Sequence, residues 1–283
     1  MKKLPLFFLL IFSFSNVLAE PPYRFGTIDS LSKQIITYKD PTTFQELIYI
    51  GEEKRNMMFF GMNKDGKIEK PKKLKLRPHV FHSFYENEIA IEILVYYEKD
   101  KNKNFKRVET LALKYAKTIG RMPHVLVQRL DAVHFFEDQD CRHGSGSAWT
   151  RIVSICPLYL KKWGVMNFII EELLVHELVH ASLDKPTSGA YKPLNPRISK
   201  SNKKTKKLNW GHWRKAGKKD KEFISDYAKS SFREDLAESF LAWLALRYNR
   251  VDDEDKAKIL KAIPNRIKYL DDQNFNMYPI VFD

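Results

Sequence analysis

The sequence predicts an α+β fold in which an extended N-terminal region is followed by a region of mixed strands and helices. Residues 20–103 contain short runs rich in β-branched and aromatic residues, separated by turn-forming segments. Helical periodicity begins at residue 105, and two strong helical patterns follow at 166–184 and 233–246. An apolar content of 43% supports a hydrophobic core in a chain of 283 residues.

Residues 1–19 are predicted to be a signal peptide. Two lysines near the start precede an apolar stretch at 4–14, and Val-Leu-Ala at 17–19 fits a cleavage site after a small residue. We therefore expect an exported protein, periplasmic or secreted, whose mature chain begins at Glu20. The alternative is an uncleaved membrane anchor, which the short apolar run disfavours.

The rest of the chain is divided near residue 104. Residues 20–103 are expected to form a β-rich N-terminal region, with strands at 34–38, 46–50 and 88–97. Residues 104–283 are expected to form a second domain. Its predicted elements are a helix at 105–122, strands at 125–133 and 148–160, and helices at 166–184, 233–246 and 252–270.

Residues 176–180, His-Glu-Leu-Val-His, form an H-E-x-x-H motif inside the predicted helix 166–184. Positions i and i+4 of a helix lie one turn apart on one face, so His176 and His180 can bind one metal ion. Glu177 lies about 100° further round the helix, where it can act as a general base on a metal-activated water. The alternative is a buried helix whose two histidines are hydrogen-bonded without a metal.

A third metal ligand is expected on the helix 233–246, because a catalytic zinc usually has three protein ligands and one open position. Pro186 stands where the extended motif would have a third histidine, which excludes that class. Glu234 and Glu238 lie at i and i+4 beside apolar residues, where two carboxylates repel each other mildly. Glu234 is the candidate zinc ligand, and Glu238 is the candidate acceptor from a ligand imidazole. The alternative is an ordinary exposed acidic face.

Tyr227, seven residues before Glu234, is the candidate stabiliser of an oxyanion. A phenol there can donate a hydrogen bond to the charge that develops in a tetrahedral intermediate, an effect often worth ~3 kcal/mol. The alternative is a tyrosine that serves only in packing or lies on the surface.

The combination of these three segments resembles the gluzincin zinc metallopeptidases, in particular the catalytic domain of anthrax lethal factor and the secreted bacterial Pro-Pro endopeptidases. The resemblance covers residues 105–250 and implies a zincin-like catalytic domain, with a small mixed sheet, an H-E-x-x-H helix and a glutamate-bearing helix. The sequence departs from the family pattern at Val179, where Gly is common, and in the long basic connection 184–222. The resemblance implies Zn²⁺ bound by His176, His180 and Glu234, Glu177 as general base and acid, Tyr227 as transition-state stabiliser and Glu238 as the outer carboxylate.

The two cysteines, Cys141 and Cys156, are predicted to form a disulfide, because an exported chain meets an oxidising compartment. Closing a loop of about 15 residues stabilises a fold by on the order of 3 kcal/mol. The alternative is a pair of zinc-binding thiolates, for which His143 is the only further ligand between them.

The net charge of +14 is concentrated between residues 197 and 221, where Lys and Arg recur against a single acidic residue, Asp220. This basic loop is interpreted either as a mobile solvated segment or as a binding surface for an anionic partner, such as a membrane surface, an anionic polymer or an acidic substrate. Nucleic acid is not expected as a partner, because the chain is predicted to be exported and carries no nucleic-acid-binding motif.

The sequence therefore predicts an exported, monomeric zinc endopeptidase that hydrolyses a polypeptide substrate with a metal-activated water. Two alternatives are retained. One is a zinc-containing but non-catalytic protein that binds an anionic surface. The other is a zinc amidase that acts on cell-wall peptides.

Overall fold

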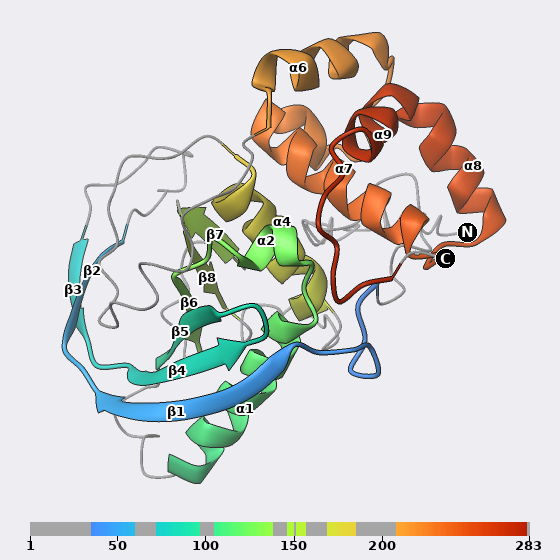
Figure 1. Cartoon of the computed structure of the whole chain (residues 1–283). Helices are drawn as coiled ribbons and strands as arrows, with labels where there is room; N and C mark the ends of the chain where they lie inside the picture. The colour runs from blue at the N-terminus through green and yellow to red at the C-terminus, as the bar shows by residue number, and fades with distance from the viewer. Residues whose placement is uncertain are drawn as a thin grey trace, which may run out of the picture.

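The computed structural model describes residues 35–59, 72–96, 105–137, 146–149, 151–156, 169–184 and 208–281. These residues form a mixed α and β fold (Figure 1). The predicted signal peptide, Cys141 and residues 197–207 of the basic loop lie outside the described residues. Export and the disulfide therefore stay predictions. None of the described helices has the length and apolar character needed to cross a bilayer.

Six strands form one mixed sheet in the order β1-β4-β5-β6-β8-β7. The antiparallel part contains β1 (Phe44–Glu52), β4 (His79–Tyr85) and β5 (Ile89–Tyr96). Two parallel pairings then join β5 to β6 (Ala132–Phe136) and β6 to β8 (Ile152–Ile155). The last strand, β7 (Gly146–Trp149), is antiparallel to β8. A separate antiparallel pair consists of β2 (Arg55–Phe59) and β3 (Lys72–Leu76).

The sheet joins the two regions expected on either side of residue 104. Strand β5 lies in the predicted N-terminal region, and its residues Glu92–Tyr96 pair with Ala132–Phe136 of β6. Both regions also contribute side chains to one hydrophobic core. The strands expected at 46–50 and 88–97 correspond to β1 and β5.

The strand expected at 34–38 is wrong over its described residues, 35–38. Ile35 and Ile36 are buried in the core, but they lie in a bend rather than a strand. The chain turns there because the backbone N–H of Thr37 donates to the Asp40 carboxylate, while the N–H of Asp40 donates back to the Thr37 carbonyl. The two isoleucines are therefore buried because this turn packs them against the core, and not because they belong to a strand.

One face of the sheet packs against α1 (Phe105–Gly120), which confirms the helix expected at 105–122. Alternate residues of β5 enter this core, as a strand with one face towards a helix requires. Gly120 ends the helix beside β1, where an added Cβ would lie 2.8 Å from the backbone nitrogen of Phe44. The close approach of helix and strand therefore requires glycine at this position.

The strand expected at 125–133 is wrong in its first half. Residues His124–Val127 form one helical turn, α2, and strand β6 begins only at Ala132. The backbone N–H groups of His124 and Val125 donate to carbonyls of Tyr278 and Asn276, so the C-terminal tail holds this turn. The strand expected at 148–160 appears as two short strands, β7 and β8.

The C-terminal part is helical, with α4 (Ile169–Ser182) between the sheet and α7 (Phe232–Arg247). Both helices were expected. Helix α7 also contacts α8 (Asp253–Ala262) and α9 (Pro264–Asp271), and α6 (Trp210–Lys219) contacts α9 (Figure 1). The described part of the expected basic loop is therefore largely a helix.

The helix expected at 252–270 is divided into two helices at Pro264. Proline lacks the N–H that the interior of a helix needs, but it is tolerated in the first turn, where Pro264 begins α9. Asp220 accepts hydrogen bonds from the backbone N–H groups of Asn265 and Arg266 and so caps the new helix.

Candidate metal centre

Helix α4 carries both histidines of the motif into the interior. Leu174, Leu178 and Val179 are fully buried on it, so the helix packs into the core around the histidines. The side chain of His176 is 2% exposed and that of His180 is 8% exposed. Val179, where the resembled family commonly has Gly, packs in the core.

Helix α7 brings Glu234 to the same point from 58 residues further along the chain. Ser231 caps this helix, and its hydroxyl accepts hydrogen bonds from the N–H groups of Arg233 and Glu234. Glu234 therefore lies in the first turn, where the positive end of the helix dipole stabilises its carboxylate.

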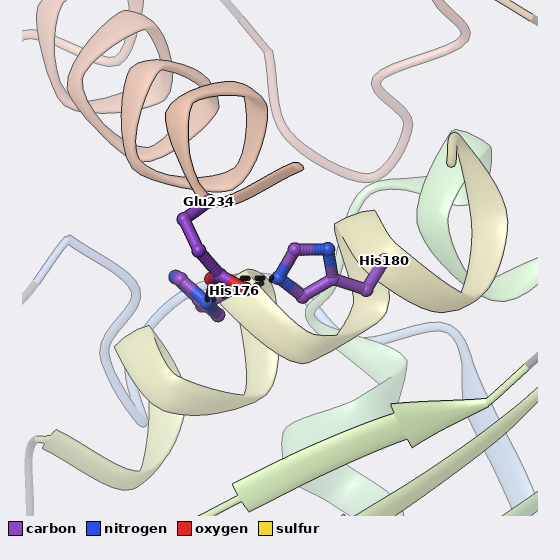
Figure 2. A group of neighbouring side chains, drawn as sticks. All are labelled: His176, His180 and Glu234. Atoms are coloured by element: carbon purple, nitrogen blue, oxygen red, sulfur yellow. Dashed lines mark hydrogen bonds and ion pairs between the residues drawn. The ribbon is translucent and has the colours of Figure 1, made fainter. Parts of the chain in front are cut away.

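The three side chains converge on one point, as Figure 2 shows. Glu234 Oε2 lies 3.0 Å from His176 Nε2 and 3.1 Å from His180 Nε2. The two Nε2 atoms are 3.2 Å apart. Within the described part of the chain, this is the one group of three such side chains whose geometry could hold a metal ion.

These spacings fit a zinc ion. Zinc bonds to imidazole nitrogen and carboxylate oxygen are about 2.0–2.2 Å long, so the donors of a tetrahedral site are about 3.4 Å apart. The observed separations of 3.0 to 3.2 Å need only a small expansion to match. Two imidazoles and one carboxylate leave the fourth position for water or substrate.

Each imidazole also has a carboxylate beside its other nitrogen. His176 Nδ1 lies 2.9 Å from Glu238 Oε1, and His180 Nδ1 lies 3.5 Å from Asp184 Oδ2, at the limit for a hydrogen bond. In a neutral imidazole, a carboxylate beside Nδ1 keeps the proton on that nitrogen. The other nitrogen, Nε2, then carries the lone pair. In this neutral tautomer both lone pairs face the carboxylate of Glu234, so a proton or a metal ion is needed between them.

The electrostatics favour positive charge at this point. Burial disfavours protonated His176, but the hydrogen bonds to Glu234 and Glu238 outweigh it and raise the pKa of His176 to about 10. Burial opposes protonation of His180 as well, yet Asp184 and Glu234 raise its pKa. Burial would raise the pKa of Glu234, but the two histidines hold it well below its ordinary value.

Glu177 and Tyr227 accompany the three donors. Glu177 is 5% exposed, and burial raises the pKa of its carboxyl despite the opposing effect of His176 and His180. Tyr227 begins the short 3-10 helix η2 (Tyr227–Ser230), and its ring centroid lies 5.9 Å from that of His176. Its pKa is raised by burial and then by the neighbouring carboxylates, so the phenol keeps its proton. Tyr227 is 39% exposed, so it is reached by solvent, in contrast to the buried histidines.

Four supporting residues were not foreseen from the sequence. Ser225 donates to Glu238 Oε2 over 2.9 Å, so both oxygens of that carboxylate are occupied. Asp184 contacts His180, Arg233 contacts Asp184, and Ser231 caps α7. Two signals were available, since Ser231-x-x-Glu234 has the spacing of a capping box and Asp184 follows His180 by one helical turn.

Comparison with known proteins gives no match, whether with protein-family models, curated proteins or solved structures. The resemblance to gluzincins therefore stays a prediction that depends on the motifs and on the geometry of this site.

Proposed function

We propose that this chain is an exported zinc endopeptidase with a zincin-like catalytic domain of the gluzincin type. The observation that carries the proposal is the convergence of His176, His180 and Glu234 from two helices, with Nε2 and Oε2 atoms 3.0 to 3.2 Å apart. Carboxylates beside both Nδ1 atoms support it further, because metal-binding histidines usually have such partners.

The residues present suit hydrolysis by activated water. Zinc held by His176, His180 and Glu234 would supply a Lewis acid and a water of lowered pKa. Glu177 would act as the general base that accepts a proton from water and as the acid that returns it to the leaving amine, and burial raises the pKa of its carboxyl towards neutral pH. The Tyr227 phenol donates a hydrogen bond to the oxygen on which negative charge develops.

The sheet edge supports a polypeptide as the substrate. Strand β7 is the last strand of the described sheet and contacts α4, which carries both histidines. An extended peptide can pair with such an edge through its backbone and so lie alongside the metal centre.

Glu177→Gln tests the mechanism. The variant should keep one zinc per chain and lose about 10²- to 10⁴-fold in hydrolysis, because general acid–base catalysis is removed while the metal donors remain. Zinc content and digestion of a mixed peptide library, with and without chelator, provide the measurement. Glu171→Gln is the matched control, since it makes the same change on the same helix and should retain activity.

The outcomes separate the candidate functions. A fully active Glu177→Gln enzyme would remove the mechanism. Zinc binding with no turnover of peptides by the unaltered chain would favour the non-catalytic alternative. Hydrolysis of purified cell-wall peptides but not of unstructured protein would favour the amidase.

We also propose that the monomer binds an anionic membrane surface through the end of the basic loop. A hollow of about 230 Å³ between α6 and α9 is lined by His212, Lys215, Lys219 and Lys268. Asp272 is the one carboxylate in this lining, and it pairs with Lys268. The two remaining lysines, one turn apart on α6, give the hollow an excess of positive charge.

Vesicle binding tests this surface. The protein should bind vesicles of phosphatidylcholine with phosphatidylserine more tightly than phosphatidylcholine alone, and added salt should weaken the binding. Lys215→Gln with Lys219→Gln should reduce it, whereas Lys256→Gln on α8 should not. Equal binding to both vesicle types would contradict the proposal.

A further inference from the structure

We infer that Asp184 is a positioning residue of the metal centre and that, together with Arg233, it fixes His180 against Glu234. The inference rests on the proposed zinc site and adds a residue pair that the motif itself does not contain. It depends on contacts between the end of α4 and the start of α7.

Asp184 is fixed at the end of α4. Its backbone N–H donates to the carbonyl of Val179 over 3.3 Å, so the chain keeps its hydrogen bonding to the helix beyond Ser182. Its carboxylate, with 1% of the side chain exposed, lies 3.5 Å from His180 Nδ1. Asp184 therefore faces the nitrogen of His180 that points away from Glu234.

Arg233 approaches the same carboxylate from the other helix. Its Nε donates to Asp184 Oδ2, the same oxygen that faces His180. Arg233 immediately precedes Glu234, and its own backbone N–H is held by Ser231. The pair therefore joins the end of the helix that carries His180 to the first turn of the helix that carries Glu234.

The chemistry of metal-bound histidine explains why this link matters. A carboxylate at Nδ1 fixes the ring orientation and directs the Nε2 lone pair towards the metal. Glu238 occupies this position for His176 at 2.9 Å, and Asp184 is the carboxylate that faces Nδ1 of His180, at 3.5 Å. A buried carboxylate without a cationic partner is costly, so the contact with Arg233 stabilises Asp184 in this position.

The chain contains a matched control for a purely structural role. Asp235, the next residue after Glu234, is also a buried carboxylate paired with an arginine, at 3.0 Å from Arg266 Nε. This pair joins α7 to α9 and touches none of the three metal donors. Loss of Asp235 therefore removes a buried ion pair without altering an imidazole.

Zinc affinity, measured by competition with a chromogenic chelator, tests the inference. Asp184→Asn should weaken zinc binding about 10- to 100-fold, the usual effect of losing a carboxylate behind a ligand. Arg233→Gln should weaken it less, and the double variant should be no worse than Asp184→Asn, because Arg233 acts through Asp184. Asp235→Asn should unfold at lower urea concentration yet bind zinc within about twofold of the unaltered chain.

Arg233 is 44% exposed at its side chain, so Arg233→Gln keeps the test valid even if Asp184→Asn does not fold. Unchanged zinc affinity in both variants would overturn the inference, and so would equal weakening by Asp235→Asn. Failure of the unaltered chain to bind zinc would instead overturn the proposed function from which the inference starts.

Discussion

Two neighbouring residues of α7 belong to two different kinds of buried charged cluster. Asp235 faces Arg266, which is 1% exposed and also binds Asp220 at 3.1 Å and the carbonyl of Glu222 at 3.2 Å. Glu234 faces two imidazole nitrogens at 3.0 and 3.1 Å. The first cluster contains the permanent charge of an arginine, whereas the second carries positive charge only when an imidazole is protonated or a metal ion binds.

The difference separates a structural cluster from the proposed metal site. Around Arg266, each carboxylate has a donor from the chain, and the cluster is complete once the helices have packed. Around Glu234, the donors face one another and need a proton or a metal ion between them. The chain supplies outer carboxylates, Glu238 and Asp184, that hold the imidazoles in this orientation.

Removing Arg266, the cation of the structural cluster, should have the largest effect on the free energy of unfolding. Arg266→Gln leaves Asp220 and Asp235 buried without their cation, and breaking a buried ion pair in this way costs about 3–5 kcal/mol. Urea unfolding followed by circular dichroism measures the loss. A loss below about 1 kcal/mol would contradict the view that Arg266 completes the structural cluster.

Removing a proposed zinc ligand should affect metal binding instead. Glu234→Gln should weaken zinc affinity by more than the 10- to 100-fold typical of an outer carboxylate, because a direct ligand is lost. Isothermal titration with zinc measures it, with Glu222→Gln, on the exposed connection before η2, as a control of equal charge change. Tight zinc binding by the Glu234 variant would place the third ligand elsewhere.

The pH dependence should also distinguish the clusters. The pKa of His176 rises from 6.5 to about 10 on folding, so the metal-free protein has this stabilisation in full below pH 6.5 and loses it towards pH 10. Zinc competes with the same proton, so zinc affinity should increase about tenfold per pH unit between 6.5 and 8.5. A pH-independent affinity would contradict this coupling.

The contribution of Asp235 to stability depends on pH over a different range. Burial raises its pKa from 3.8 to about 6, although Arg266 opposes the shift, so the folded chain binds this proton more tightly than the unfolded chain. Its contribution to stability is therefore lost as pH rises from 3.8 to about 6. Urea unfolding of Asp235→Asn against pH should lack this change.

The smallest expected effect concerns the cap of α7. Ser231→Ala leaves the N–H groups of Arg233 and Glu234 without their acceptor and should cost ~1 kcal/mol of stability. Thermal unfolding measures it, and Ser230→Ala, just outside the helix, is the control. Equal melting temperatures for the two variants would mean that the cap does not hold the first turn.

The parts of the site that could be predicted from sequence depend on local spacing. Helical period places His176 above His180 and Glu234 above Glu238, and both helices appear where they were expected. The catalytic roles and the bound zinc remain proposals. The contacts of Arg233 with Asp184 and of Ser225 with Glu238 cross 49 and 13 residues of sequence, so local spacing could not predict them, whereas the position of Asp184 one turn after His180 was a local signal.

The errors in the fold also come from tertiary contacts. Val125 and Val127 favour a strand by type, yet they lie in a helical turn whose His124 and Val125 N–H groups donate to the C-terminal tail. The basic sequence around Lys215 suggested a loop, but Trp213 and Ala216 are buried and Asn209 caps the segment as a helix. Local propensity did not show that these residues would meet a partner.

Zinc content of the purified chain tests the central claim most directly. Inductively coupled plasma mass spectrometry should find one zinc per unaltered chain and none in a folded His176→Ala, His180→Ala double variant. A folded unaltered chain that takes up no zinc, or a double variant that retains it, would contradict the account.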